Sequence, residues 1–147
     1  MDASSTPVHE LVPHGPEMTL IEKLISYDAL RSVATARIDE SNVFFENGGV
    51  PAWAGLEYMA QAIAAHAGFA ARLRGEPPAV GFLLGTRAYV SSVANFPAGT
   101  WLSISVEPEV VEAGFARFNC SIETDRVVAT AVVTVYRPSS ENEVSAP

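Results

Sequence analysis

The sequence has a single cysteine and no long uninterrupted apolar run. Cys120 cannot form an internal disulfide, and a lone cysteine in a strand-like segment is more often a buried small hydrophobe than a nucleophile. No stretch reaches about 18 consecutive apolar residues, because Glu57, Gln61 and His66 interrupt the longest apolar tract, so no membrane span is expected. The first residues lack the basic run and apolar stretch of a secretory signal, which predicts a cytoplasmic protein.

Basic residues are also scarce. Nine Lys and Arg stand against 17 Asp and Glu, which gives a net charge of −8. Such a surface repels a phosphate backbone, so nucleic acid is not expected as a partner. No spacing of His, Cys, Asp and Glu matches a metal site, no Gly-x-Ser-x-Gly elbow occurs, and the stretch from Gly81 to Gly85 is not a phosphate loop. We therefore expect neither a metal nor another cofactor.

What the sequence does have is enough apolar material for one core. Its 147 residues are 48% hydrophobic, with a mean hydropathy of +0.18, which suits a single domain. Residues 1–7 and 139–147 are polar and lack periodicity, so they predict a flexible N-terminus and a disordered tail. The folded domain is expected to span residues 8–138.

One long helix is predicted over residues 53–73. Pro51 suits a first helical turn, the segment is rich in alanine without internal proline, and Gly75 with Pro77 and Pro78 ends it. The segment is apolar on nearly every face, which predicts a helix buried inside the protein. Other elements must therefore surround it.

The surrounding elements are predicted as β-strands. Residues 18–27 and 31–38 should form a hairpin, and four β-branched and aromatic segments follow the helix, at 80–90, 101–111, 115–122 and 127–136. Four strands in sequence favour an antiparallel meander, and hence an α+β fold in which the sheet wraps around the helix. Neither face of the last strand is strongly polar, so a homodimer or heterodimer is expected to cover the sheet's second side.

Glu57 is the strongest candidate for chemistry, because it is an acid near the start of an otherwise apolar helix. Burial disfavours ionisation of a carboxylate, and enzymes prepare general acids and bases in this way. Gln61, four residues on, shares its helix face and can hydrogen-bond the carboxyl group or a substrate oxygen. We predict this pair as catalytic. The alternative is a surface acid stabilised by the helix dipole, with Gln61 as its neutral partner.

Two histidines are weaker candidates. His66 is nine residues from Glu57, about 180° around a straight helix, so the two cannot converge on one site. We interpret His66 as a packing residue. His14 lies in a rigid loop between Pro13 and Pro16, where it can serve either as a structural hydrogen-bonding group or at the edge of a site.

A double glycine precedes the helix. The amides of Gly48, Gly49 and Ala52 are predicted to be free to donate to a carbonyl oxygen, with the positive end of the helix dipole behind them. One acid beside an oxyanion-binding helix start suits chemistry on a thioester, such as hydration, dehydration or hydrolysis. The alternative is a plain loop that leads into the helix.

The helix segment carries a recognisable motif, Pro-x5-Glu-x-Met-Ala-Gln-Ala, formed by Pro51, Glu57, Met59, Ala60, Gln61 and Ala62. It resembles the central-helix motif of the hotdog-fold 3-hydroxyacyl-[acyl-carrier-protein] dehydratases. Two other stretches, 12–23 and 81–99, are similar to the family's Leu-Pro-His-Arg opening and to its Pro-Gly turn. More narrowly, residues 44–61 look like the divergent dehydratase subunit of aryl polyene biosynthesis. The resemblance implies a hotdog fold and an acyl chain tethered to a carrier protein.

One departure from the family bears on mechanism. In the family a histidine precedes the helix and moves the second proton, and its position falls on Val43, which cannot transfer a proton. The family site lies across a dimer interface, so this chain is expected to supply the residues of only half a site. Three readings stay open: a composite dehydratase with a histidine-bearing hotdog partner, a non-catalytic subunit, or a thioesterase. The predicted substrate-binding residues are Val43, Phe45, Gly48, Gly49, Ala52 and Phe82.

Overall fold

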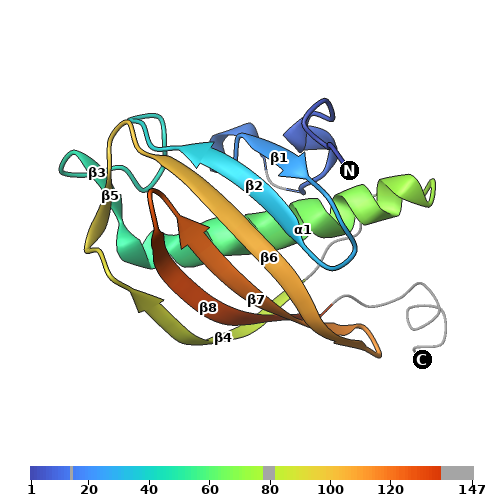
Figure 1. Cartoon of the computed structure of the whole chain (residues 1–147). Coiled ribbons are helices and arrows are strands. Elements are labelled where there is room, and N and C mark those ends of the chain that lie inside the picture. Colours follow the sequence, from blue (N-terminus) through green and yellow to red (C-terminus); the bar gives the residue numbers. More distant parts are fainter. Residues whose placement is uncertain (14, 78–81, 137–147) are drawn as a thin grey trace.

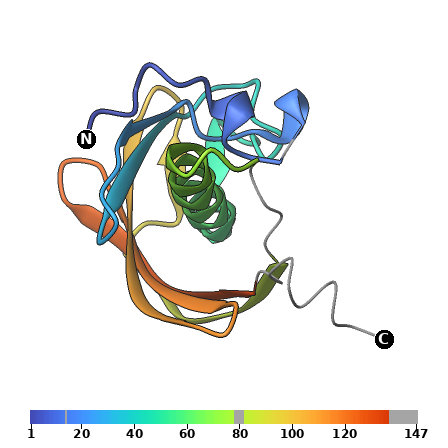
Figure 2. The ribbon, with the colours of Figure 1, turned by 90° about the vertical axis from the view of Figure 1, so that its right-hand side faces the viewer.

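The computed structural model describes residues 1–13, 15–77 and 82–136. A six-stranded antiparallel sheet curls around one long helix, α1 (Gly55–Leu73), as Figure 1 shows from the side and Figure 2 nearly along the helix. The predicted α+β fold, an antiparallel sheet wrapped around a central helix, is therefore confirmed. The predicted helix differs only in its first turn, where Ala52–Ala54 form a 3-10 turn, η3, that leads into α1.

The strand order in the sheet is β1-β2-β6-β7-β8-β4. Its members are β1 (Lys23–Ser26), β2 (Ser32–Arg37), β4 (Phe82–Ser91), β6 (Trp101–Glu112), β7 (Phe115–Glu123) and β8 (Val127–Tyr136). The predicted hairpin is confirmed as the β1–β2 pair. The predicted four-strand meander is wrong for β4, which pairs with β8 at the sheet edge, whereas β2 pairs with β6.

The reason is a short strand that the sequence did not reveal. Between β4 and β6 the chain forms β5 (Asn95–Pro97), which pairs with β3 (Gly49–Pro51) just before the helix. This second, two-stranded sheet carries the chain from the β4 edge across to the side on which β6 begins (Figure 1). β4 and β6 are therefore separated by two other strands, β7 and β8, in the main sheet.

The core fills the space between the concave face of the sheet and α1. Alternate residues of the strands point inward, among them Ile104, Phe118 and Ile122, and they pack against Tyr58 and Met59 of the helix. Cys120 belongs to the same buried layer, and its burial raises the pKa of the thiol to about 12. The prediction of an inert cysteine therefore agrees with its environment, because reactivity needs the thiolate.

One side of α1 is less well covered than the others. Between Leu56 and Ala70 the half-buried positions lie along one side of the helix, and every other residue of this stretch is buried; they are Leu56, Glu57, Ala60, Ala64, Ala67 and Ala70. The predicted all-round burial is therefore wrong for this stripe of the isolated chain. Within the described residues, no helix is long and apolar enough to cross a membrane.

The N-terminus is attached to the fold. Asp2 forms a bridge with Ser26, the Tyr27 amide donates to the Met1 carbonyl at 2.8 Å, and Ala3 is buried. Backbone pairing along β1 thus holds residues 1–3, and the flexible N-terminus over residues 1–7 stays a prediction. The predicted tail at 139–147 lies outside the described residues, and the domain limits of 8–138 stay a prediction.

Candidate active site

Glu57 lies in the first turn of α1, on the half-buried stripe, rather than deep in the core. Its Oε1 accepts a hydrogen bond from Gln61 Nε2 at 3.3 Å, one helical turn further on. The predicted pairing of these two side chains on one helix face is therefore confirmed. Glu57 is half-buried, and Gln61 anchors its carboxyl group.

Gln61 forms the predicted bond to the Glu57 carboxyl group, and its other hydrogen-bonding positions are used as well. It is fully buried, and its Oε1 accepts from the amides of Leu20 at 2.7 Å and Ile21 at 3.4 Å. Its Nε2 donates to the Met18 carbonyl at 2.7 Å as well as to Glu57. An amide side chain has two acceptor and two donor positions, and all four are used here. Gln61 therefore orients Glu57 and ties the chain before β1 to the helix, and it has no capacity left for a substrate oxygen.

The loop that carries Val43 is fixed to the helix beside Glu57. Asn42 Nδ2 hydrogen-bonds the hydroxyl of Tyr58, the residue after Glu57, and Asn42 Oδ1 accepts from the Phe44 amide at 2.7 Å. Burial raises the pKa of Tyr58 to about 12, so the hydroxyl stays neutral. Val43, next to this anchor, is 52% exposed. The Asn42–Tyr58 contact could not be predicted from the sequence, since an isolated Asn and a helical Tyr do not indicate that they are neighbours.

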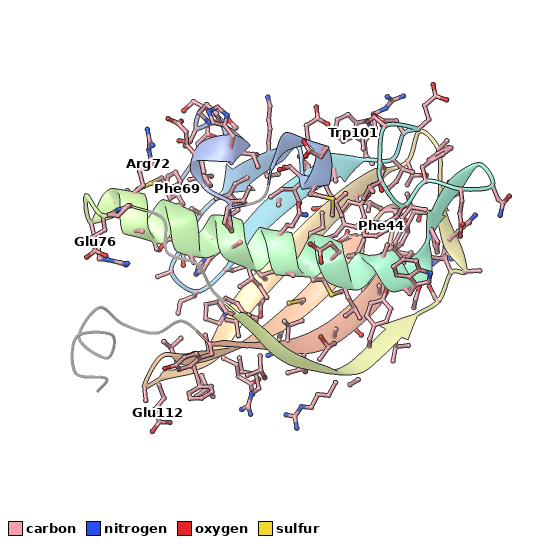
Figure 3. The ribbon with its side chains drawn as sticks, turned by 180° about the vertical axis from the view of Figure 1, so that it is seen from behind. Phe44, Phe69, Arg72, Glu76, Trp101 and Glu112 are labelled. Carbon is pink, nitrogen blue, oxygen red and sulfur yellow. The ribbon has the colours of Figure 1, made fainter. Side chains whose placement is uncertain are left out.

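Aromatic side chains surround the helix start. Phe44 packs edge-on against Trp53 with ring centroids 5.3 Å apart, and Figure 3 shows Phe44 beside the first turns of α1. Trp53 is 60% exposed, and Phe45 is half-buried against the core. Phe82 begins β4, and its side chain lies outside the described part of the structure. A role for these residues in binding an acyl chain stays a prediction.

The two glycines before the helix serve separate purposes. Asn47 (φ 50°) and Gly48 (φ 80°) form a tight turn in which Glu46 and Gly49 exchange both backbone hydrogen bonds. Gly49 is instead extended in β3, where a Cβ would lie 2.6 Å from the Phe96 carbonyl oxygen. The first glycine permits the turn, and the second permits β3 to approach β5.

The predicted free amides are therefore largely occupied. Gly49 N–H donates to the Glu46 carbonyl at 3.1 Å, and Ala52 N–H donates to the Ala94 carbonyl at 3.0 Å. The prediction that these two groups are free to hold a carbonyl oxygen is wrong, because the turn at Glu46–Gly49 and the segment after β4 already use them. Binding of substrate by Gly48, Gly49 or Ala52 stays a prediction, and at Gly49 and Ala52 it needs atoms other than the amide groups.

His66 is remote from Glu57, as the helical spacing predicts. It is buried between Tyr27 and Phe118, and its Nδ1 lies 2.6 Å from the hydroxyl oxygen of the fully buried Ser32. This environment confirms a packing role. His14 lies outside the described residues. Among the residues that are described, no three His, Cys, Asp or Glu side chains come together as metal ligands would.

Burial of His66 has a consequence for stability against pH. Burial holds the pKa of His66 below its ordinary value of 6.5, and the Asp28 carboxylate offsets this only in part. The unfolded chain therefore takes up a proton at higher pH than the folded one, and stability is lost as the pH falls from 6.5 towards the lowered pKa. We expect the Tm to drop over this range in the wild type and to drop less in His66→Gln, whose amide can still bond Ser32.

Thermal unfolding between pH 7.5 and 5 measures this difference. The exposed His9 supplies the matched control, because His9→Gln removes a histidine without removing a buried one. Equal pH dependence in wild type and His66→Gln would contradict the expectation.

The comparisons with known proteins add to this geometry. A family model for the ApeP-like proteins, described as ApeP dehydratase, matches residues 6–146. The structure resembles a chain of the dehydratase heterocomplex ApeI:P from Xenorhabdus doucetiae, with a TM-score of 0.85 and 28% identity over 94% of this chain and 95% of that one. No curated protein matches the sequence.

Looser matches share the fold alone. AziG from S. sahachiroi has a TM-score of 0.60 and 15% identity, over 79% of this chain and 90% of its own. A hypothetical thioesterase from Streptococcus pneumoniae TIGR4, solved with coenzyme A, has a TM-score of 0.58 and 13% identity, over 80% and 85%.

The sheet wrapped around α1 defines a hotdog fold, and the family model places the chain in the dehydratase class. The chain belongs to the ApeP-like dehydratase family, whose model spans nearly all of it. The predicted resemblance to the hotdog dehydratases, and among them to the subunit of aryl polyene biosynthesis, is thereby confirmed.

Proposed function

We propose that this chain is one subunit of a heteromeric 3-hydroxyacyl thioester dehydratase of aryl polyene synthesis, and that Glu57 is its contribution to the reaction. The observation that carries the proposal is the half-buried Glu57, which Gln61 anchors in the first turn of α1, in a chain that has Val43 at the family's histidine position. A dehydration needs two proton transfers, and Glu57 can perform one of them. The histidine must come from another subunit.

In the proposed reaction the partner's histidine removes the proton from C2 of the 3-hydroxyacyl thioester. Glu57, in its carboxylic acid form, gives its proton to the C3 hydroxyl, which leaves as water while the C2–C3 double bond forms. The proton taken by the histidine is later returned to Glu57 through solvent, which completes the cycle. Gln61 holds the carboxyl group towards the open side of the helix throughout. The acyl chain is carried on an acyl carrier protein.

The exposed surface near Glu57 supports a second subunit. Val43, Trp53 and Val90 are 52%, 60% and 63% exposed, which is unusual for side chains of this size around one helix start. β4, which carries Val90, is an edge strand of the sheet. The half-buried stripe of α1 also lies open to a partner. The related ApeI:P structure is itself a heterocomplex of dehydratase subunits, which favours a hotdog heterodimer over a homodimer.

Co-purification with a histidine-bearing hotdog subunit tests the proposal. We expect the chain alone to leave a 3-hydroxyacyl carrier-protein thioester unchanged and the mixed complex to convert it to the enoyl thioester, seen by mass spectrometry as loss of water. The same complex with the partner's histidine replaced by alanine is the control and should be inactive. Robust dehydration by the isolated chain would refute the composite site. Release of free acid and carrier thiol would instead indicate a thioesterase.

A further inference from the structure

Ala52 lies three residues before α1, and both its backbone N–H and its carbonyl oxygen form hydrogen bonds. Its N–H donates to the Ala94 carbonyl at 3.0 Å. Its carbonyl oxygen accepts from the amide of Gly55 and from the hydroxyl of Tyr89 on β4. The Tyr89 hydroxyl thus forms a hydrogen bond that joins the edge strand of the sheet directly to the start of the helix.

β4 is shaped so that Tyr89 can make this bond. The pairing of β4 with β8 jumps from Arg87↔Val132 to Val90↔Thr130, and Ala88 between them has a φ of 57°. Such a bulge takes a residue out of the regular ladder and redirects its side chain. Tyr89 is consequently half-buried and reaches under the 3-10 turn, whereas its neighbour Val90 is exposed.

Gly55 at the first position of α1 is shaped to fit the same contact. A Cβ there would overlap the Tyr89 hydroxyl and lie 3.3 Å from its Cζ, and 3.1 Å from Ile122 Cδ1. Gly55 has an ordinary helical φ of −54°, so its backbone does not require glycine. The space taken by Tyr89 is therefore what requires it, and glycine at a helix position is otherwise unfavourable.

We propose that Tyr89 is a positioning residue for the dehydration reaction: it sets where α1 begins and thereby where the Glu57 carboxyl group lies. The inference rests on the proposed function of Glu57. Gly55 and Glu57 belong to the same helical turn, so a shift of the turn moves the carboxyl group with it. Tyr89 lies between the bulge and the exposed Val90. It therefore also couples the position of the Glu57 carboxyl group to the edge strand β4. Misplacement of a reacting group by about 1 Å can cost about 10²-fold in rate.

Three variants, measured in the mixed complex, test the inference. Tyr89→Phe removes only the hydroxyl and should lower kcat about tenfold with KM nearly unchanged. Gly55→Ala should lower kcat further, because its Cβ displaces Tyr89. The double variant should recover to the level of Tyr89→Phe, since removing the hydroxyl removes the overlap. If the two losses add instead, the two positions act independently, which contradicts the inferred contact. Tyr27→Phe, at the far end of α1, is the matched control and should leave kcat unchanged.

Hydrogen exchange in the isolated chain gives a readout that does not depend on turnover. Tyr89→Phe should speed exchange of the amides of residues 53–57, and Tyr27→Phe should not. If Tyr89→Phe keeps the wild-type kcat and exchange rates while Glu57→Gln is inactive, the positioning role is overturned and the proposed function stands. If Glu57→Gln is fully active, the proposed function is overturned. Faster exchange in Tyr89→Phe would then still support its control of the helix start.

Discussion

Glu57→Gln should stop turnover by the mixed complex and leave the fold almost unchanged. A positioned acid contributes about 10²–10⁴-fold to a proton transfer, and an amide cannot supply the proton. We therefore expect kcat to fall by about this factor. The new side chain is the same size and its carbonyl oxygen can still accept from Gln61 Nε2, which now donates to Glu57 Oε1 at 3.3 Å. Because Glu57 is half-buried, the free energy of unfolding should change by no more than about 0.5 kcal/mol.

The matched control is Glu46→Gln, which neutralises an exposed carboxylate of the neighbouring loop. It makes the same carboxyl-to-amide replacement as Glu57→Gln in the same region, so it separates loss of the Glu57 acid from a general effect of removing a carboxyl group near the site. We expect its kcat to match the wild type. Unchanged turnover in Glu57→Gln, in a complex of normal size on gel filtration, would favour a non-catalytic role for this chain.

The local elements were predictable from the sequence because local patterns determine them. The alanine-rich tract between Pro51 and Gly75 and the four β-branched segments after it gave the helix and strand positions to within a few residues. The helical spacing also correctly predicted that Glu57 and Gln61 share one helix face and that His66 lies away from it. These inferences needed only the 3.6-residue and two-residue repeats.

The features that were missed depend on contacts between distant segments. Gln61 bonds Leu20 across 41 residues of sequence, and nothing in its own helix shows that its four hydrogen-bonding positions are all used. The approach of the chain around β5 to the helix start likewise decides that the Ala52 amide is occupied by Ala94 and that β4 lies at the sheet edge. A loop rich in glycine looks the same whether its amides are paired or free, so this part of the site could not be predicted.

Gly68→Ala should destabilise the protein, although alanine is normally the better residue inside a helix by about 1 kcal/mol. Gly68 is buried where the 3-10 turn η1 (Val8–Glu10) and Leu11 cross α1. A Cβ at this position would overlap the Leu11 carbonyl oxygen and lie 2.9 Å from its carbonyl carbon and 3.0 Å from its Cα. These are backbone atoms, which cannot rotate away, so the segment must shift. We expect a loss of about 1–3 kcal/mol in the free energy of unfolding, measured by urea denaturation.

The neighbouring Ala67 supplies the control, because it lies on the half-buried stripe of the same helix. Ala67→Gly should also cost about 1 kcal/mol, in the direction that helix propensity dictates. The opposite preferences of adjacent positions then isolate the contact with Leu11, and stabilisation by Gly68→Ala would show that this contact is absent. The effect should extend to the site. The segment that Leu11 anchors continues to residues that Gln61 hydrogen-bonds, which are Met18, Leu20 and Ile21. Displacement of Leu11 should therefore strain the hydrogen bonds of Gln61, the side chain that orients Glu57.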